Sequence, residues 1–109
     1  MTETTSLACN LAAFNSEQAD RYQTLAQQLQ RAVQAVQELP DGYAFRLPGE
    51  ASTCLMIAEF ITLERLCCPF LKFVLEVEPD RGPAWLRVTG PAGVKQVLAM
   101  ELALEITVE

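Results

Sequence analysis

Histidine is missing from this sequence of 109 residues. Without an imidazole, the chain can build neither a Ser-His-Asp triad nor a Cys-His pair, and a metal ion would find no imidazole ligand. This absence excludes most familiar hydrolase mechanisms. The remaining candidate chemistry lies in the four cysteines.

Basic residues are also scarce. The chain has 8 Lys and Arg against 14 Asp and Glu, a net charge of −6, and no basic residue before Arg21. Because no basic stripe can neutralise phosphates, we expect neither unaided nucleic-acid binding nor attachment to anionic membranes. The first residues carry no sustained apolar segment and do not resemble a secretory signal, which predicts a cytoplasmic protein.

Long apolar runs, internal repeats and linker-like tracts are absent from the sequence as well. Half of the residues are apolar and 20% are charged, which is the balance of a globular protein rather than of a disordered chain or a membrane span. We therefore expect one domain over residues 1–109, with a single core.

Hydrophobic periodicity predicts both helices and strands. An amphipathic helix is expected from Glu17 to about Glu38, after an N-cap at Asn15 and Ser16. The segment from about Ala51 to Cys67 is apolar nearly all round, which predicts a helix that is central or covered by a partner.

Alternating apolar residues indicate strands at 43–47, 71–77 and 85–89, and Gly90-Pro91 opens a last helix. Residues 6–11 are read as an edge strand or extended arm, and residues 106–108 as frayed helix or a short strand.

The order helix, strand, helix, hairpin, helix predicts an α+β fold. We expect a single two-layer domain in which a small, mostly antiparallel sheet carries about three helices on one face. Since so short a chain has difficulty covering the apolar helix over residues 51–67, a homodimer is also expected.

The adjacent pair Cys67-Cys68 is the most unusual feature of the sequence. A proline pushes the preceding residue out of the helical region, so Pro69 should leave Cys68 at the corner between the second helix and the next strand. Adjacent cysteines close only a strained ring, which favours metal ligation or transient thiol exchange over a mutual structural disulfide. A helix C-terminus in an acidic protein disfavours a reactive thiolate, and a bound cation would reverse that effect.

The other two cysteines are interpreted differently. Cys9 lies in an extended segment that could run beside the corner and supply a third thiolate to a low-coordinate site, while an inert buried role is equally open for it. Cys54 stands 14 residues before Cys68, about 21 Å along a continuous helix and too far to share one ion. We therefore expect Cys54 to be a core residue.

Glu64 lies three and four positions before the two cysteines, on the same side of the expected helix. It can act as an outer-shell acceptor or as a weak oxygen ligand. The interpretation we favour is the commoner one, a solvated carboxylate near a helix end. The loop 89–93 is similarly read as a cap and turn rather than as an anion-binding glycine loop.

A small bacterial family resembles this chain at the block Glu64-Arg65-Leu66-Cys67-Cys68-Pro69-Phe70-Leu71-Lys72-Phe73. The resemblance extends over most of the chain, through Cys9, residues 41–46 and residues 85–91. That family includes stand-alone proteins and domains appended to metal-responsive regulators, and it recurs in mercury and heavy-metal resistance. The resemblance implies heavy-metal association with no established enzymatic activity, and it matches Cys9, Cys67 and Cys68 as candidate ligands. No regulator's DNA-binding region accompanies the block, so we expect no direct transcriptional role.

Together these observations predict a non-enzymatic protein that binds a soft metal ion, Hg(II) or Cu(I), through Cys67 and Cys68. Cys9 is the candidate third ligand, and an outer-shell role stays open for Glu64. Zinc is less favoured, because a closed zinc site needs a fourth ligand. Two alternatives stay open. One is a thiol redox protein that cycles a disulfide between Cys9 and one of the pair, and the other is a structural or dimerising module with inert cysteines.

Overall fold

A four-stranded antiparallel sheet organises the part of the chain that the computed structural model describes, residues 10–103. The strand order is β1-β2-β4-β3. Strands β1 (Ala35–Leu39) and β2 (Gly42–Leu47) form one hairpin, and β3 (Lys72–Val77) and β4 (Ala84–Thr89) form the other. The two hairpins join through the β2–β4 pair, which runs from Gly42 opposite Thr89 to Leu47 opposite Ala84.

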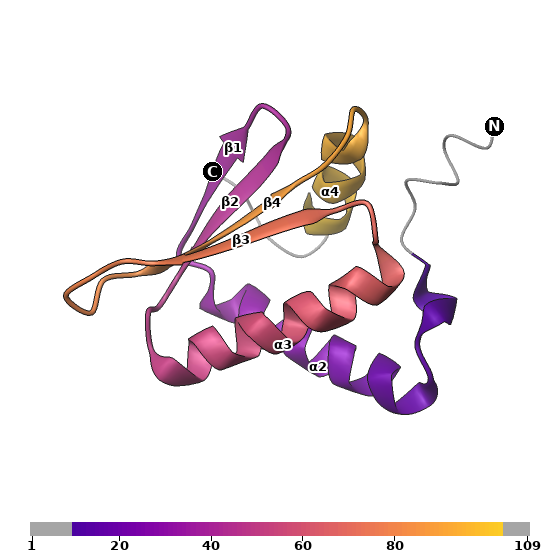
Figure 1. Ribbon diagram of the computed structural model, residues 1–109, viewed down its shortest axis with the longest axis horizontal. Helices are drawn as coiled ribbons and strands as arrows, with labels where there is room; N and C mark the ends of the chain where they lie inside the picture. Colours follow the sequence, from indigo (N-terminus) through magenta and orange to yellow (C-terminus); the bar gives the residue numbers. More distant parts are fainter. Residues whose placement is uncertain (1–9, 104–109) are drawn as a thin grey trace.

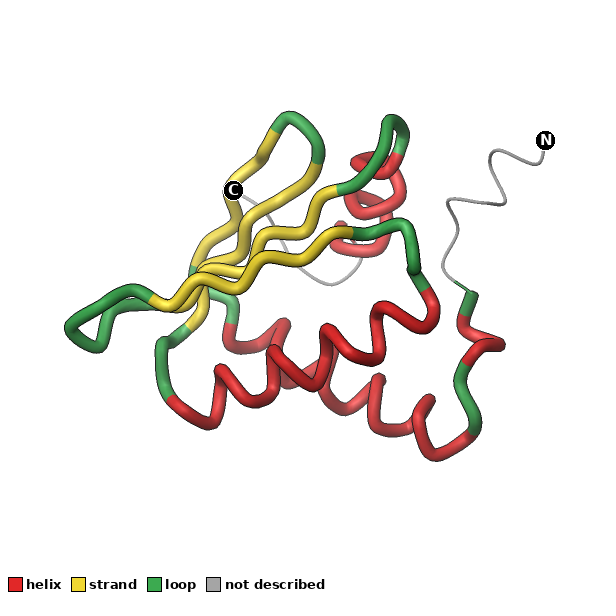
Figure 2. Tube along the Cα trace, viewed as in Figure 1, coloured by secondary structure: helices red, strands yellow, loops and turns green. Residues whose placement is uncertain are grey.

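Three α-helices of the described chain lie against one face of this sheet. They are α2 (Ser16–Ala32), α3 (Ala51–Cys67) and α4 (Val94–Ala103), and the short 3-10 helix η1 (Leu11–Ala13) precedes α2. Figure 1 shows α2 and α3 running beneath the strands, and Figure 2 shows the same separation into a helical layer and a strand layer. The predicted α+β architecture is therefore confirmed.

The core lies between these two layers. Alternate residues of a strand point to the same side of a sheet, so every second residue of β2 and β4 faces the helices. One buried cluster contains Leu29 of α2, Ile57 of α3, Val94 and Leu98 of α4, and the strand residues Phe45, Leu47, Ala84, Leu86 and Val88. Because all three helices contribute to this one cluster, they share one face of the sheet.

The predicted first helix extends too far at its C-terminal end. It ends at Ala32, and residues 35–39 form strand β1 instead of continuing as helix to Glu38. Val33 takes an extended backbone (φ −65°, ψ 126°), and the Gln34 N–H donates to the Arg46 carbonyl at 2.7 Å. Pairing with β2 therefore overrides a local pattern that fits a helix equally well.

The start of the last helix and the segment before α2 also differ from the prediction. The last helix begins at Val94 rather than at Gly90-Pro91, because the Val94 N–H closes a turn onto the Pro91 carbonyl at 3.0 Å. Leu11 belongs to η1 rather than to an edge strand or extended arm. Residues 6–9, which belong to the same prediction, and residues 106–108, predicted as frayed helix or a short strand, lie outside the described residues.

Helix α2 begins with a capping box and is joined to α3 by an ion pair. The Asn15 side chain accepts from the Gln18 N–H at 2.8 Å, and the Gln18 side chain accepts from the Asn15 N–H at 3.0 Å. Farther along, Arg21 donates to both carboxylate oxygens of Glu59 at 2.8 and 2.7 Å, which lowers the pKa of Glu59. The Arg21–Glu59 ion pair therefore joins α2 to α3.

Helix α3 has a buried stripe that runs along its whole length to the cysteines. The structure buries Thr53, Ile57, Glu64 and Cys67. These residues are 4, 7 and 3 positions apart, intervals that keep side chains on one side of an α-helix. Leu55 and Leu66 instead lie on the exposed side. The stripe that packs into the core therefore continues directly into Glu64 and Cys67.

We expect Ile57→Ala to lower the free energy of unfolding by about 2–5 kcal/mol, because Ile57 is fully buried and the substitution leaves a cavity. The matched control is Leu55→Ala on the same helix, where the side chain is 72% exposed and the change should stay within about 0.5 kcal/mol. Urea denaturation measures both values. Equal losses in the two variants would contradict the orientation of α3.

Candidate functional site

The chain turns sharply where α3 ends. The last helical residue is Cys67, and the Cys68 N–H makes a final bond to the Glu64 carbonyl at 2.7 Å. Pro69 cannot continue the helix, and the Leu71 N–H donates to the Cys68 carbonyl at 3.2 Å to close the corner before β3. The predicted position of Cys68, at the corner between helix and strand, is confirmed.

Three side chains with metal-ligating atoms meet at this corner. Glu64, Cys67 and Cys68 are all buried, and one ligand atom from each lies within 4.8 Å of the other two. The two Sγ atoms are 3.4 Å apart, and Cys67 Sγ lies 3.9 Å from Glu64 Oε1. Two soft sulfur donors and one carboxylate oxygen can therefore reach a common centre.

Glu64 is not the solvated carboxylate that we favoured from the sequence. Its side chain is buried, with a relative exposure of 8%. The reason is the position of Glu64 on the inward stripe of α3, seven residues after the fully buried Ile57. A carboxyl group in such a place requires polar partners.

Tyr22 of α2 supplies one such partner. Its hydroxyl donates to Glu64 Oε2 at 2.6 Å, while the other oxygen, Oε1, faces Cys67. The Tyr22 ring is held between Phe14 and Phe60, with ring centroids at 5.1 and 5.5 Å. Tyr22 therefore orients the carboxylate toward the sulfurs. The sequence analysis did not identify Tyr22 as part of the site, because nothing local connects it with a residue 42 positions later.

The four cysteines differ in chemical state and position. Cys54 and Cys67 are thiols, whereas Cys68 is disulfide-bonded. Cys54 packs against the core and is not part of the group at the corner, as expected. Cys9, the predicted third ligand, lies outside the described residues, but its neighbour Asn10 donates its backbone N–H to the Cys67 carbonyl at 2.7 Å.

Charge strongly limits the ionisation of this group. Two unit negative charges 4.8 Å apart repel by about 3.5 kcal/mol at an effective dielectric constant of about 20. The C-terminal end of the α3 dipole adds further negative potential at Cys67 and Cys68. When Cys68 is reduced, protons or a metal cation must therefore accompany a buried set of two thiolates and a carboxylate.

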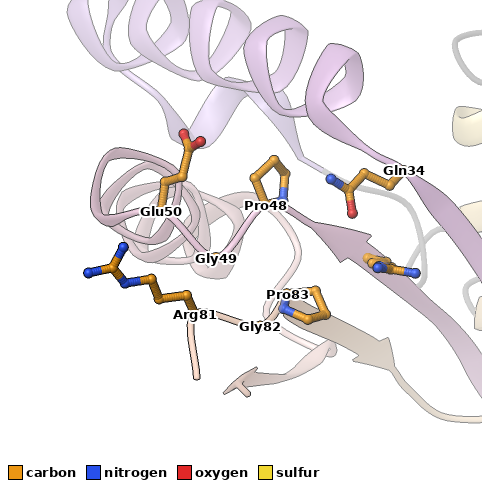
Figure 3. A pocket seen from close by; sticks show the side chains of 8 residues that line it. Gln34, Pro48, Gly49, Glu50, Arg81, Gly82 and Pro83 are labelled. Carbon is orange, nitrogen blue, oxygen red and sulfur yellow. The ribbon is translucent and has the colours of Figure 1, made fainter. Parts of the chain in front are cut away.

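A surface pocket lies at the opposite end of α3. It has a volume of about 520 Å³ and lies between the N-terminal end of α3 and the β3–β4 hairpin (Figure 3). Its charged lining residues are Arg46, Glu50 and Arg81. Because α3 spans 17 residues, or about 25 Å, this pocket is separate from the cysteine corner.

Comparisons with protein-family models, with curated proteins and with solved structures found no match for this chain. Within residues 10–103, no helix is both long and apolar enough to cross a membrane.

We expect Tyr22→Phe to lower the free energy of unfolding by about 1–3 kcal/mol, because it removes a hydrogen bond to a buried carboxyl group. The control is Tyr43→Phe, since within the described chain the Tyr43 ring contacts Lys95 and its hydroxyl has no hydrogen-bond partner. That change should stay within about 0.5 kcal/mol. Guanidinium denaturation of both variants tests the contact, and an unchanged stability of Tyr22→Phe would contradict it.

Proposed function

We propose that this protein binds one thiophilic metal ion through the thiolates of Cys67 and Cys68. The observation that carries the proposal is the convergence of Cys67 Sγ, Cys68 Sγ and a Glu64 oxygen within 4.8 Å in a buried corner. In the metal-bound form Cys68 is reduced. Glu64 either supplies a weak oxygen ligand or accepts a hydrogen bond beside the ion.

The distance between the sulfurs favours a bent arrangement around the ion. With metal–sulfur bonds of about 2.3 Å, sulfurs 3.4 Å apart subtend an angle of about 95° at the metal. This angle is much closer to trigonal or tetrahedral geometry than to a straight two-coordinate bond. The proposal therefore includes at least one further ligand.

Cys9 is the third ligand in this proposal. Asn10, which follows Cys9 in the sequence, donates its backbone N–H to the Cys67 carbonyl at the end of α3, and this contact supports the choice of Cys9. A third thiolate would complete a trigonal site of the kind that soft ions accept. Hg(II) and Cu(I) fit this donor set best, and zinc would need Glu64 as a fourth ligand.

Electrostatics and family resemblance support the same function. A cation removes the repulsion among two thiolates and a carboxylate at the negative end of a helix, which is otherwise unfavourable for thiolate formation. The resemblance around Cys67-Cys68-Pro69-Phe70 leads us to place the chain in the heavy-metal-associated family. The proposed role is non-enzymatic binding or sequestration of the ion.

A second candidate function is thiol–disulfide redox chemistry. One observation favours it: Cys68 is disulfide-bonded, and the Cys67 sulfur lies 3.4 Å away, within reach for exchange. Redox activity predicts reversible thiol oxidation that does not depend on any metal. Thiol counts with and without metal therefore separate the two functions.

Anaerobic titration of the reduced, metal-free protein with Hg(II), and separately with Cu(I), tests the proposal. We expect one ion to protect two or three thiols from alkylation together, and the Cys67→Ser/Cys68→Ser double variant to lose this protection. Cys54→Ser is the matched control and should behave like the wild type. Glu64→Gln should weaken binding by about 10- to 100-fold, whereas Glu59→Gln on the same helix should not.

Absence of tight binding by the reduced wild type would contradict the proposal. So would equal binding by the double variant, because the ion would then be held elsewhere.

A further inference from the structure

Strand β3 forms an open edge of the sheet within residues 10–103. It comes last in the strand order β1-β2-β4-β3, and β4 is the one strand that pairs with it (Figure 1). All 6 of its residues pair with β4 in unbroken register, so the strand has no bulge, and it contains no proline. Proteins commonly interrupt an exposed edge with such features, because a regular edge can pair with another chain.

The hydrogen-bond ladder determines which backbone groups of β3 face the open edge. Bonded and non-bonded pairs alternate along an antiparallel ladder. The Glu78 N–H donates to the Pro83 carbonyl at 3.0 Å, which makes Glu78 a bonded position, and the even-numbered residues of β3 then bond to β4 as well. The N–H and carbonyl groups of Phe73, Leu75 and Val77 therefore point away from β4. Within the described chain, no other element bonds to them.

The side chains of β3 add apolar surface to this edge. Val74 and Val77 are 39% and 51% exposed. The other large apolar side chains that are exposed in the described chain lie on α3, and none lies on β1, the strand at the opposite edge. Exposed apolar surface on the described sheet therefore belongs to β3 alone.

The two charged residues of β3 are placed symmetrically about Val74. Lys72 and Glu76 stand two positions before and after it, and all three lie on the face of the sheet away from the helices. Glu76 is paired with Arg87 of β4, whereas Lys72 makes no ion pair with another described residue. If two copies of β3 pair antiparallel about Val74, each Lys72 lies opposite Glu76 of the partner subunit. Opposite charges in this position stabilise an antiparallel pair.

We propose that two copies of this protein associate through their β3 edges, in an antiparallel pairing centred on Val74, and form a homodimer with one continuous sheet. In this register Phe73 exchanges backbone hydrogen bonds with Leu75 of the partner subunit, which satisfies the open groups. Val74 meets its own copy in a non-bonded pair, where side chains approach most closely. The contact uses the same surface on both copies, so it closes at two subunits instead of extending into a fibre.

The neighbouring register is less favourable. A pairing centred on Leu75 would place Val74 opposite Glu76 of the partner subunit, an apolar side chain against a charge. It would also move Lys72 opposite Glu78 of the partner subunit. Reversing the charge at Glu76 and at Glu78 in separate variants therefore distinguishes the two registers.

Charge reversal tests the interface in the full chain. We expect Lys72→Glu and Glu76→Lys each to raise the dissociation constant of the dimer at least about 10-fold, because each variant replaces two attractive pairs with two repulsive ones. Sedimentation equilibrium over a range of concentrations measures this constant. An equimolar mixture of the two variants should recover the dimer, since each then supplies the charge that the other lacks.

Two further variants serve as controls. Arg46→Glu reverses a charge on the same face of the sheet but within β2, opposite Trp85 and away from the edge, so the dissociation constant should match that of the wild type. Glu78→Lys should change it much less than Glu76→Lys. Recovery of the dimer in the mixture shows that Lys72→Glu and Glu76→Lys are folded.

Each contrary result has a definite meaning, and none of them bears on the metal site. A wild type that sediments as a monomer at every concentration would overturn the proposal. A dimer that persists in both charge reversals would place the contact elsewhere, as on the exposed Leu55 and Leu66 of α3, and would overturn the β3 interface. Loss of the dimer without recovery in the mixture, or a dimer sensitive to Glu78→Lys rather than to Glu76→Lys, would overturn the pairing about Val74.

Discussion

Packing of the α3 stripe against the sheet is the constraint on which the rest of the site depends. Ile57 is fully buried in the core cluster, and this fixes the rotation of α3. Given that rotation, Glu64 and Cys67 must face inward, and the sharp turn at Pro69 keeps Cys68 beside Cys67. The same hydrophobic burial that stabilises the fold therefore brings three acidic or soft donor groups into one buried place.

The polar groups at this place are stabilised in pairs across the helical layer. Tyr22 binds one Glu64 oxygen and leaves the other facing the sulfurs, so α2 positions a group that belongs to α3. The Arg21–Glu59 pair lies farther from the corner and holds the same two helices together at the surface. Burial of a carboxyl group beside two cysteines is unfavourable for stability alone, which is the kind of local conflict that proteins keep at functional sites.

Much of this arrangement could be predicted from local sequence, and the failures have physical causes. Pro69 places Cys68 at a corner by backbone sterics, and alternation in residues 43–47 identifies the buried side of β2. Strand β1 could not be predicted, because the pattern after Ala32 also fits a helix and only pairing with β2 decides between them. The burial of Glu64 was missed because α3 is apolar nearly all round and its sequence does not reveal which side faces the core. The homodimer stays a prediction. Leu55 and Leu66 of α3 are the exposed large apolar side chains of that helix.

The central claim is that one ion is shared by Cys67 and Cys68 at the end of α3. X-ray absorption at the mercury edge, on reduced protein loaded with one Hg(II) per chain, tests it most directly because it counts the sulfur atoms bound to the ion. The account predicts two or three sulfur ligands per mercury. A single sulfur ligand, or a shell of oxygen and nitrogen atoms alone, would contradict it.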